Sequence, residues 1–108
     1  MIIYNITVNI DDAVHYEWLE WMKTEHIPKV LGTGKFERAT LSKVLVDEEM
    51  GGQTYSIQYR SYSREALDAY YREDADGLRQ DGLKKFADKM LAFRTELQII
   101  DEYNVAFT

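Results

Sequence analysis

Apolar and polar residues alternate in several segments of the chain. In the first segment, the apolar Tyr4, Ile6 and Val8 are separated by polar residues. A period of two is typical of a strand that buries one face. The alternation predicts four strands, at residues 2–10, 36–47, 54–62 and 90–100. An acidic stretch with paired glycines at 47–52 predicts a hairpin between the second and third strands.

The segment between the first two strands has helical spacing. Trp18, Trp21 and Met22 fall within an arc of roughly 100° on a helix, which predicts an apolar stripe facing the sheet. Pro28 is the only proline, and it lacks a backbone donor and disfavours helical geometry at the preceding residue. This first helix is therefore predicted to break near His26.

A second helical segment follows the third strand. Ser63 is a suitable N-cap, and the apolar residues after it recur at helical spacing. Gly77 and Gly82 are expected to divide this segment into a helix and a shorter follow-on piece that ends near Phe86.

The order of these elements is β-α-β-β-α-β, which predicts a ferredoxin-like α+β fold. In this fold a four-stranded antiparallel sheet carries both helices on one face. A length of 108 residues suits one domain, which we expect to span residues 1–102, with a C-terminal tail at 103–108.

The alternation also assigns residues to the two faces of the sheet. Leu91, Phe93 and Leu97 are expected under the helices, together with the apolar residues of the first three strands. The opposite face is expected to be polar and is either solvated or the seam of a homodimer. The residues predicted for this dimer face are Asn5, Thr7, Arg38, Gln58, Arg60, Arg94 and Glu96.

Composition restricts the classes of function. A net charge of −6 disfavours binding to the phosphate backbone of nucleic acids. No apolar run is long enough for a membrane span, and the N-terminus lacks the pattern of a signal peptide. The chain has no cysteine and only two histidines, so we expect no metal site, no cofactor and a cytoplasmic location.

The end of the first helix carries the candidate chemistry. Glu25 is predicted near the centre of the apolar arc and His26 at its edge, so the two could form a base and its partner in a cavity. The protonated form of a histidine at a helix C-terminus is favoured by the helix dipole. Alternatively, both residues are the polar end of an ordinary core helix.

Aromatic residues predict where a ligand would lie. Tyr4, Trp18 and Tyr59 are expected to approach the space between helix and sheet, close to His26. They could line a cavity for a flat organic molecule. The alternative is ordinary core packing, with tyrosine hydroxyls at its edges.

The sequence resembles a family of small bacterial domains of unknown function within the dimeric α/β-barrel superfamily. The resemblance covers the chain to about Glu102 and is carried by the residues at 1–10, 18–28, 51–56 and 88–95. It implies ferredoxin-like subunits that pair sheet to sheet. The wider superfamily includes cofactor-independent monooxygenases, EthD-like proteins, isomerases and haem-handling enzymes. His26-Ile27-Pro28 is similar to a His-x-Pro element at the end of the first helix in EthD-like members.

Two functional hypotheses follow from these observations. The first is a homodimer that binds a small, aromatic molecule between its helices and its sheet. The second is a cofactor-independent enzyme, similar to monooxygenases or EthD-like proteins, with His26 as acid or base. The enzyme hypothesis requires the His26 ring to face a cavity with a hydrogen-bond partner in reach.

Overall fold

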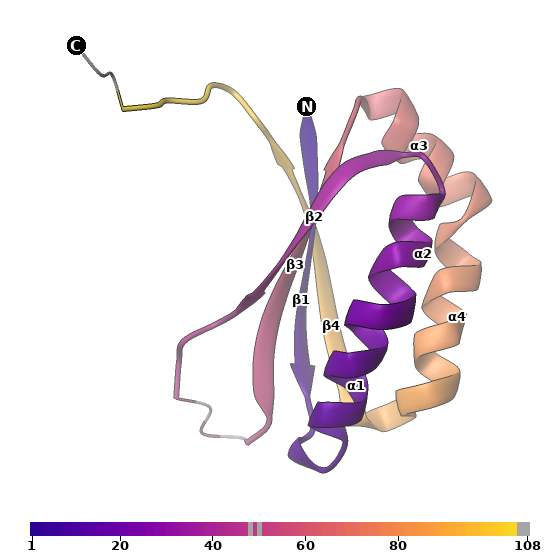
Figure 1. Ribbon diagram of the computed structural model, residues 1–108, viewed down its shortest axis with the longest axis vertical. Coiled ribbons are helices and arrows are strands. Elements are labelled where there is room, and N and C mark those ends of the chain that lie inside the picture. The colour runs from indigo at the N-terminus through magenta and orange to yellow at the C-terminus, as the bar shows by residue number, and fades with distance from the viewer. Residues whose placement is uncertain (48, 50, 106–108) are drawn as a thin grey trace.

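The sheet has four antiparallel strands in the order β2-β3-β1-β4 (Figure 1). The computed structural model describes residues 1–47, 49 and 51–105. The strands are β1 (Ile2–Ile10), β2 (Phe36–Lys43), β3 (Gln53–Ser61) and β4 (Met90–Gln98). They lie where the alternation predicts them, although β2 and β4 end earlier than expected. Residues 48 and 50 of the predicted hairpin loop and 106–108 of the predicted tail lie outside the described residues.

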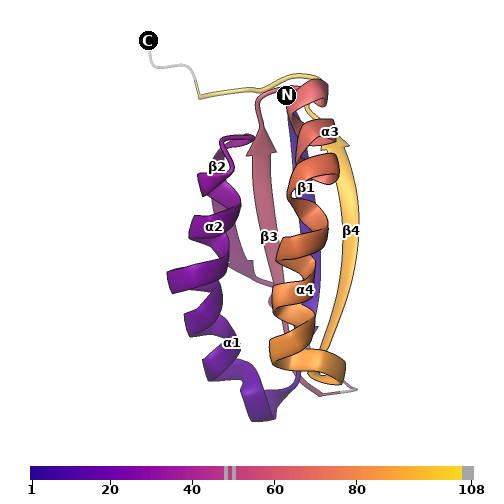
Figure 2. The same ribbon diagram turned by 90° about the vertical axis from the view of Figure 1, so that its right-hand side faces the viewer.

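All helices cover one face of the sheet and leave the other face bare (Figures 1 and 2). The α-helices are α1 (His15–Trp21), α2 (Ile27–Gly32), α3 (Arg64–Glu73) and α4 (Ala75–Phe86). Single helical turns are η1 (Asp12–Val14), η2 (Met22–His26) and η3 (Ala87–Lys89). The predicted ferredoxin-like α+β fold is confirmed. No helix among the described residues is both long enough and apolar enough to span a membrane.

The first helical segment continues past its predicted end. α1, η2 and α2 form one unbroken run, and Pro28 lies in the first turn of α2. η2 is a π-helical turn, in which the Ile27 amide donates to the Met22 carbonyl five residues earlier. Proline is tolerated in the first turn of a helix, and the wider π turn supplies such a start inside the run. The predicted break at His26 is therefore wrong.

The second helical segment divides before its glycines. α3 ends at Glu73, and Asp74 separates it from α4, so Gly77 and Gly82 both lie inside α4. The start of α3 agrees with the sequence, because the Ser63 hydroxyl accepts a hydrogen bond from the Ala66 amide at 3.1 Å.

An aromatic cluster joins the helices to the sheet. Tyr4 on β1 is buried at its centre. Its ring lies 5.6 to 6.3 Å, between centroids, from the rings of Phe36, Tyr59, Tyr70 and Tyr71. Ring pairs at such distances stabilise a core beyond the apolar area that they bury. The cluster holds α3 over the middle of the sheet.

The faces of β4 are the reverse of those predicted. Arg94 pairs with Ile6 and Glu96 pairs with Tyr4, so both charged side chains lie on the helix-covered face. The expectation that they belong to the bare face is wrong. Residues 90–93 are all apolar, so their pattern does not distinguish the two faces, and a shift of one residue inverts a strand.

Three apolar side chains of β4 therefore lie on the bare face. Leu91, Phe93 and Leu97, which were expected under the helices, have exposed fractions of 59%, 63% and 44%. They form an apolar stripe along one edge of the bare face. We call these three residues the β4 stripe.

The remaining residues predicted for the bare face do lie there: Asn5, Thr7, Arg38, Gln58 and Arg60. Asn5 accepts a hydrogen bond from the Ser56 hydroxyl at 2.8 Å, which joins β1 to β3. Arg60 binds both carboxylate oxygens of Glu102, so the segment after β4 is tied to β3. The centre of the bare face is thus polar and hydrogen-bonded, beside an apolar edge.

Candidate functional site

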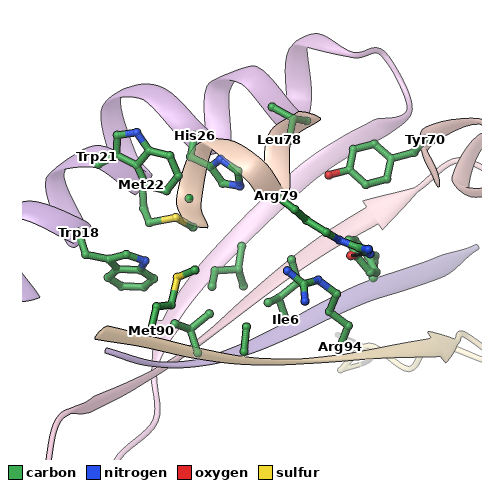
Figure 3. Close-up of a pocket in the computed structure, with 15 residues that line it drawn as sticks. Ile6, Trp18, Trp21, Met22, His26, Tyr70, Leu78, Arg79, Met90 and Arg94 are labelled. Atoms are coloured by element: carbon green, nitrogen blue, oxygen red, sulfur yellow. Dashed lines mark hydrogen bonds between the residues drawn. The ribbon is translucent and has the colours of Figure 1, made fainter. Parts of the chain in front are cut away.

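A small cavity lies between the helices and the sheet (Figure 3). Its walls come from β1, β3, β4, the first helical run, α3 and α4, and its free volume is about 50 Å³. A hollow of about 190 Å³ between α4 and β4 shares Arg79, Met90, Ala92 and Arg94 with it. A single water occupies roughly 10–15 Å³ of such volume, so the enclosed part admits only a few water-sized groups. A larger ligand would extend into the hollow at the edge of the sheet.

The π turn determines which side chains of the first helical run reach this cavity. The rings of Trp21 and His26 are stacked, with centroids 4.6 Å apart and planes at 24°. In an uninterrupted α-helix, residues five apart would point about 140° away from each other. The wider turn of η2 brings them to the same side, with Met22 beside them (Figure 3).

His26 is neutral at physiological pH. Burial lowers its pKa to about 4, the positive charges of Lys29 and Arg94 act in the same direction, and Asp81 opposes them. The sequence led us to expect a favoured protonated form, because His26 was placed at a helix end. The helix continues through His26, so that dipole effect is absent and desolvation dominates.

The His26 ring faces the cavity, but no described residue is hydrogen-bonded to its Nδ1 atom, which is buried. Glu25, its expected partner, is exposed and does not line the cavity. The π turn changes the phase of the helix, so the angular count that placed Glu25 on the apolar arc fails there. The structure therefore does not bring Glu25 and His26 together.

Two of the three predicted ligand-binding aromatic residues line the cavity. Tyr4 and Trp18 contribute to its wall. Tyr59 lies in the aromatic cluster, fully buried and away from the cavity. Its hydroxyl has no hydrogen-bond partner among the described residues, and burial raises its pKa far above the ordinary value. Tyr59 is a core residue.

Two arginines reach the cavity from opposite walls. Arg94, which was expected on the bare face, enters from β4. Arg79, which was not among the expected site residues, enters from α4. Figure 3 shows their guanidinium groups converging between Tyr70 and Ile6. Arg79 precedes Gly82 and Phe86 by three and seven residues, which is the spacing of one buried helix face. That spacing was a usable sequence signal.

The side chains at the cavity suit organic groups better than a metal ion. The part of the chain that the structure describes holds no cluster of three or more histidine, cysteine, aspartate or glutamate residues placed for a metal. The cavity offers one imidazole nitrogen, two guanidinium groups and a largely apolar wall. Such a site can bind an apolar body and hydrogen-bond its polar end.

Comparison with known families gives one match. Residues 1–100 match the family described as domain of unknown function DUF4286. A comparison with curated proteins finds no match.

Solved structures with the same fold are distant in sequence. A candidate antibiotic biosynthesis monooxygenase from Deinococcus radiodurans is 12% identical, with a TM-score of 0.69 over 99% of this chain and 100% of that one. A dimeric ferredoxin-like protein from an uncultured marine organism is 13% identical, with a TM-score of 0.68 over 94% and 97%. An EthD family protein from Bacillus halodurans is 15% identical, with a TM-score of 0.66 over 91% and 100%. At these identities the likeness shows the fold alone.

We expect His26 to titrate near pH 4, because its pKa falls from 6.5 to about 4 on folding. Between these two values the unfolded chain binds more protons than the folded protein. The free energy of unfolding therefore decreases as the pH is lowered through this window, by about 3 kcal/mol in total from this group. NMR titration of the imidazole resonances measures the midpoint directly.

A His26→Gln variant provides the control for stability. The free energy of unfolding of the wild type, relative to this variant, should fall between pH 6.5 and pH 4 and stay constant above pH 6.5. A His26 midpoint close to 6.5, or a parallel pH dependence in both proteins, would contradict burial as the cause.

Proposed function

The chain belongs to the DUF4286 family, a domain of unknown function, and we propose that it binds a small, partly aromatic molecule in the cavity beside His26. The observation that carries this proposal is the wall of the cavity. Both tryptophans of the chain line it, together with Met22 and Met90. Methionine side chains are flexible, so they can rearrange around a ligand larger than the enclosed space.

A glycine in α4 supports the same proposal. Gly82 lines the cavity, where an added Cβ atom would meet Met90 Cε at 3.5 Å and Trp21 Cη2 at 3.6 Å. Those are ordinary contacts, so the backbone could carry a side chain here. Glycine inside a helix costs about 1 kcal/mol relative to alanine. Keeping this position without a side chain leaves space beside Trp21.

We further propose that the protein acts as a homodimer, with the bare face of the sheet as its seam. The β4 stripe gives this face an exposed apolar edge beside the polar centre. The segment after β4 leaves the sheet on the side away from the helices (Figure 1) and carries the exposed Ile100 and Tyr103. A fold relative described as a dimeric ferredoxin-like protein is consistent with such pairing. A twofold interface can bury an apolar edge together with a polar centre whose groups form hydrogen bonds.

Enzymatic use of His26 is the second candidate, favoured by one observation: its ring faces the cavity. Two others favour binding. A pKa of about 4 is far from the value near 7 that suits a general base at neutral pH. No residue in the described part of the chain orients the ring by hydrogen bonding to Nδ1.

A cytoplasmic location, inferred from the cysteine-free composition, completes the proposal.

Filling the cavity tests the binding site. We expect Gly82→Leu to weaken binding of 2-naphthalenemethanol by about tenfold or more, because the new side chain takes the space beside Trp21. The indole N–H resonances of Trp18 and Trp21 report binding in ¹H–¹⁵N spectra, since the chain has only these two tryptophans.

Gly77→Leu is the matched control, because Gly77 lies in the same helix and nothing is within 4 Å of its added Cβ. It should leave binding unchanged. Gly82→Ala is the milder variant if Gly82→Leu does not fold, and it should weaken binding less. Equal affinities in the wild type and all three variants would contradict this site.

Adjacent residues of β4 test the seam, because they point to opposite faces. Phe93→Asp places a charge in the β4 stripe and should convert the dimer into a monomer at micromolar concentration. Arg94→Ala should leave the dimer intact, because Arg94 faces the helices. Sedimentation velocity measures both. A wild-type monomer, or a dimer that persists in Phe93→Asp, would contradict the proposed seam.

A further inference from the structure

The charged end of the cavity is unusual in a protein with a net charge of −6. Arg79 and Arg94 converge there from α4 and β4, the two walls that also bound the adjoining hollow (Figure 3). Arg79 is half-buried and Arg94 is exposed, so neither is a fully buried charge. Two guanidinium groups close together repel each other, and an anion between them would be attracted by both. The partner of these two arginines is therefore informative about the ligand.

Among the described residues, no carboxylate is hydrogen-bonded or ion-paired with either arginine, although the charge of Asp76 acts on Arg79 without a direct bond. Arg94 has no hydrogen bond or ion pair among them. Arg79 donates one hydrogen bond, from Nη2 to the Tyr4 hydroxyl at 3.2 Å, and its buried Nε has no partner in the part of the chain that the structure describes. By contrast, Arg64 binds both oxygens of Glu96 at 2.8 and 3.0 Å. The fold pairs Arg64 with a carboxylate, whereas neither cavity arginine has a bonded carboxylate among the described residues.

The nearest acid along the same face of β4 is already in use. Glu96 lies two residues from Arg94 on the helix-covered face. It accepts hydrogen bonds from Arg64 and from the Tyr71 hydroxyl, and these bonds lower its pKa to about 2. Glu96 is thus held ionised by partners on α3 and is not available to neutralise Arg94.

The geometry of the two arginines favours a planar anion. A guanidinium group presents its N–H donors in a fork that matches the two oxygens of a carboxylate. The apolar wall beside them, with Met90 and Ile6, suits a hydrophobic body attached to that group. Neutral His26 adds no charge of its own at physiological pH.

We propose that the cavity selects a small carboxylate with an apolar, ring-sized body, and that Arg79 and Arg94 donate hydrogen bonds to its carboxylate oxygens. The inference rests on the proposed function, since it names the ligand class of the same cavity. The apolar body lies towards Trp21 and Met22. The two arginines act as binding residues and set the preference for a negative charge.

Two probes with the same ring separate charge from shape. We expect 2-naphthoate to bind about tenfold or more tightly than the neutral 2-naphthalenemethanol, because hydrogen bonds to a charged partner are the stronger kind. Arg79→Gln and Arg94→Gln should each reduce this preference to about threefold or less. Each variant should weaken binding of the carboxylate more than binding of the alcohol, because only the carboxylate carries a charge. Titration calorimetry gives the dissociation constants.

Arg72→Gln is the matched control, because Arg72 is exposed on α3 and does not line the cavity. It should preserve the full preference for the carboxylate. Equal affinity of the wild type for both probes would overturn the anion proposal and leave the binding function standing. A preference that survives in Arg79→Gln and Arg94→Gln would also overturn it. Failure of both probes to bind would overturn the anion proposal together with the binding function.

Discussion

The π turn η2 is the constraint on which the site depends. It lets the first helical run pass Pro28 without a break, because the wider turn accommodates a proline that has no backbone amide donor. It also stacks Trp21 on His26 and brings the imidazole to the cavity. A regular α-helix of the same residues would point His26 away from Trp21. π turns inside helices occur frequently at functional sites, and this one forms part of the cavity wall.

The register of β4 couples the two faces of the sheet. Successive side chains of a strand point to opposite faces, so the register that places the half-buried Ala92 under the helices also brings Arg94 to the cavity and leaves Phe93 exposed. One strand thereby contributes a charge to the proposed ligand site and an apolar edge to the proposed dimer seam. A dimer formed through the bare face would leave the hollow between α4 and β4 on the opposite side of the sheet, accessible to a ligand.

Local patterns in the sequence predicted the fold, but they did not predict for every strand and helix which side faces the core. Clear alternation fixed the faces of β1 and β3, where polar residues such as Gln58 separate buried ones such as Ile57. In β4 the run from Met90 to Phe93 is apolar throughout, so only pairing with β1 decides its faces. The π turn has no sequence signature of comparable strength, and Glu25 was misplaced for that reason. Arg79 was missed because the break was expected at Gly77, which obscured the continuous inner face of α4.

The ligand that we propose for this cavity is an anion held by Arg79 and Arg94. The most direct measurement is a crystal structure of the protein with bound 2-naphthoate. We expect the carboxylate within about 2.7–3.2 Å of guanidinium nitrogens from both arginines, with the ring between Met90 and Trp21. A naphthoate bound on the bare face of the sheet, or bound in the cavity with its carboxylate turned away from both arginines, would contradict this proposal.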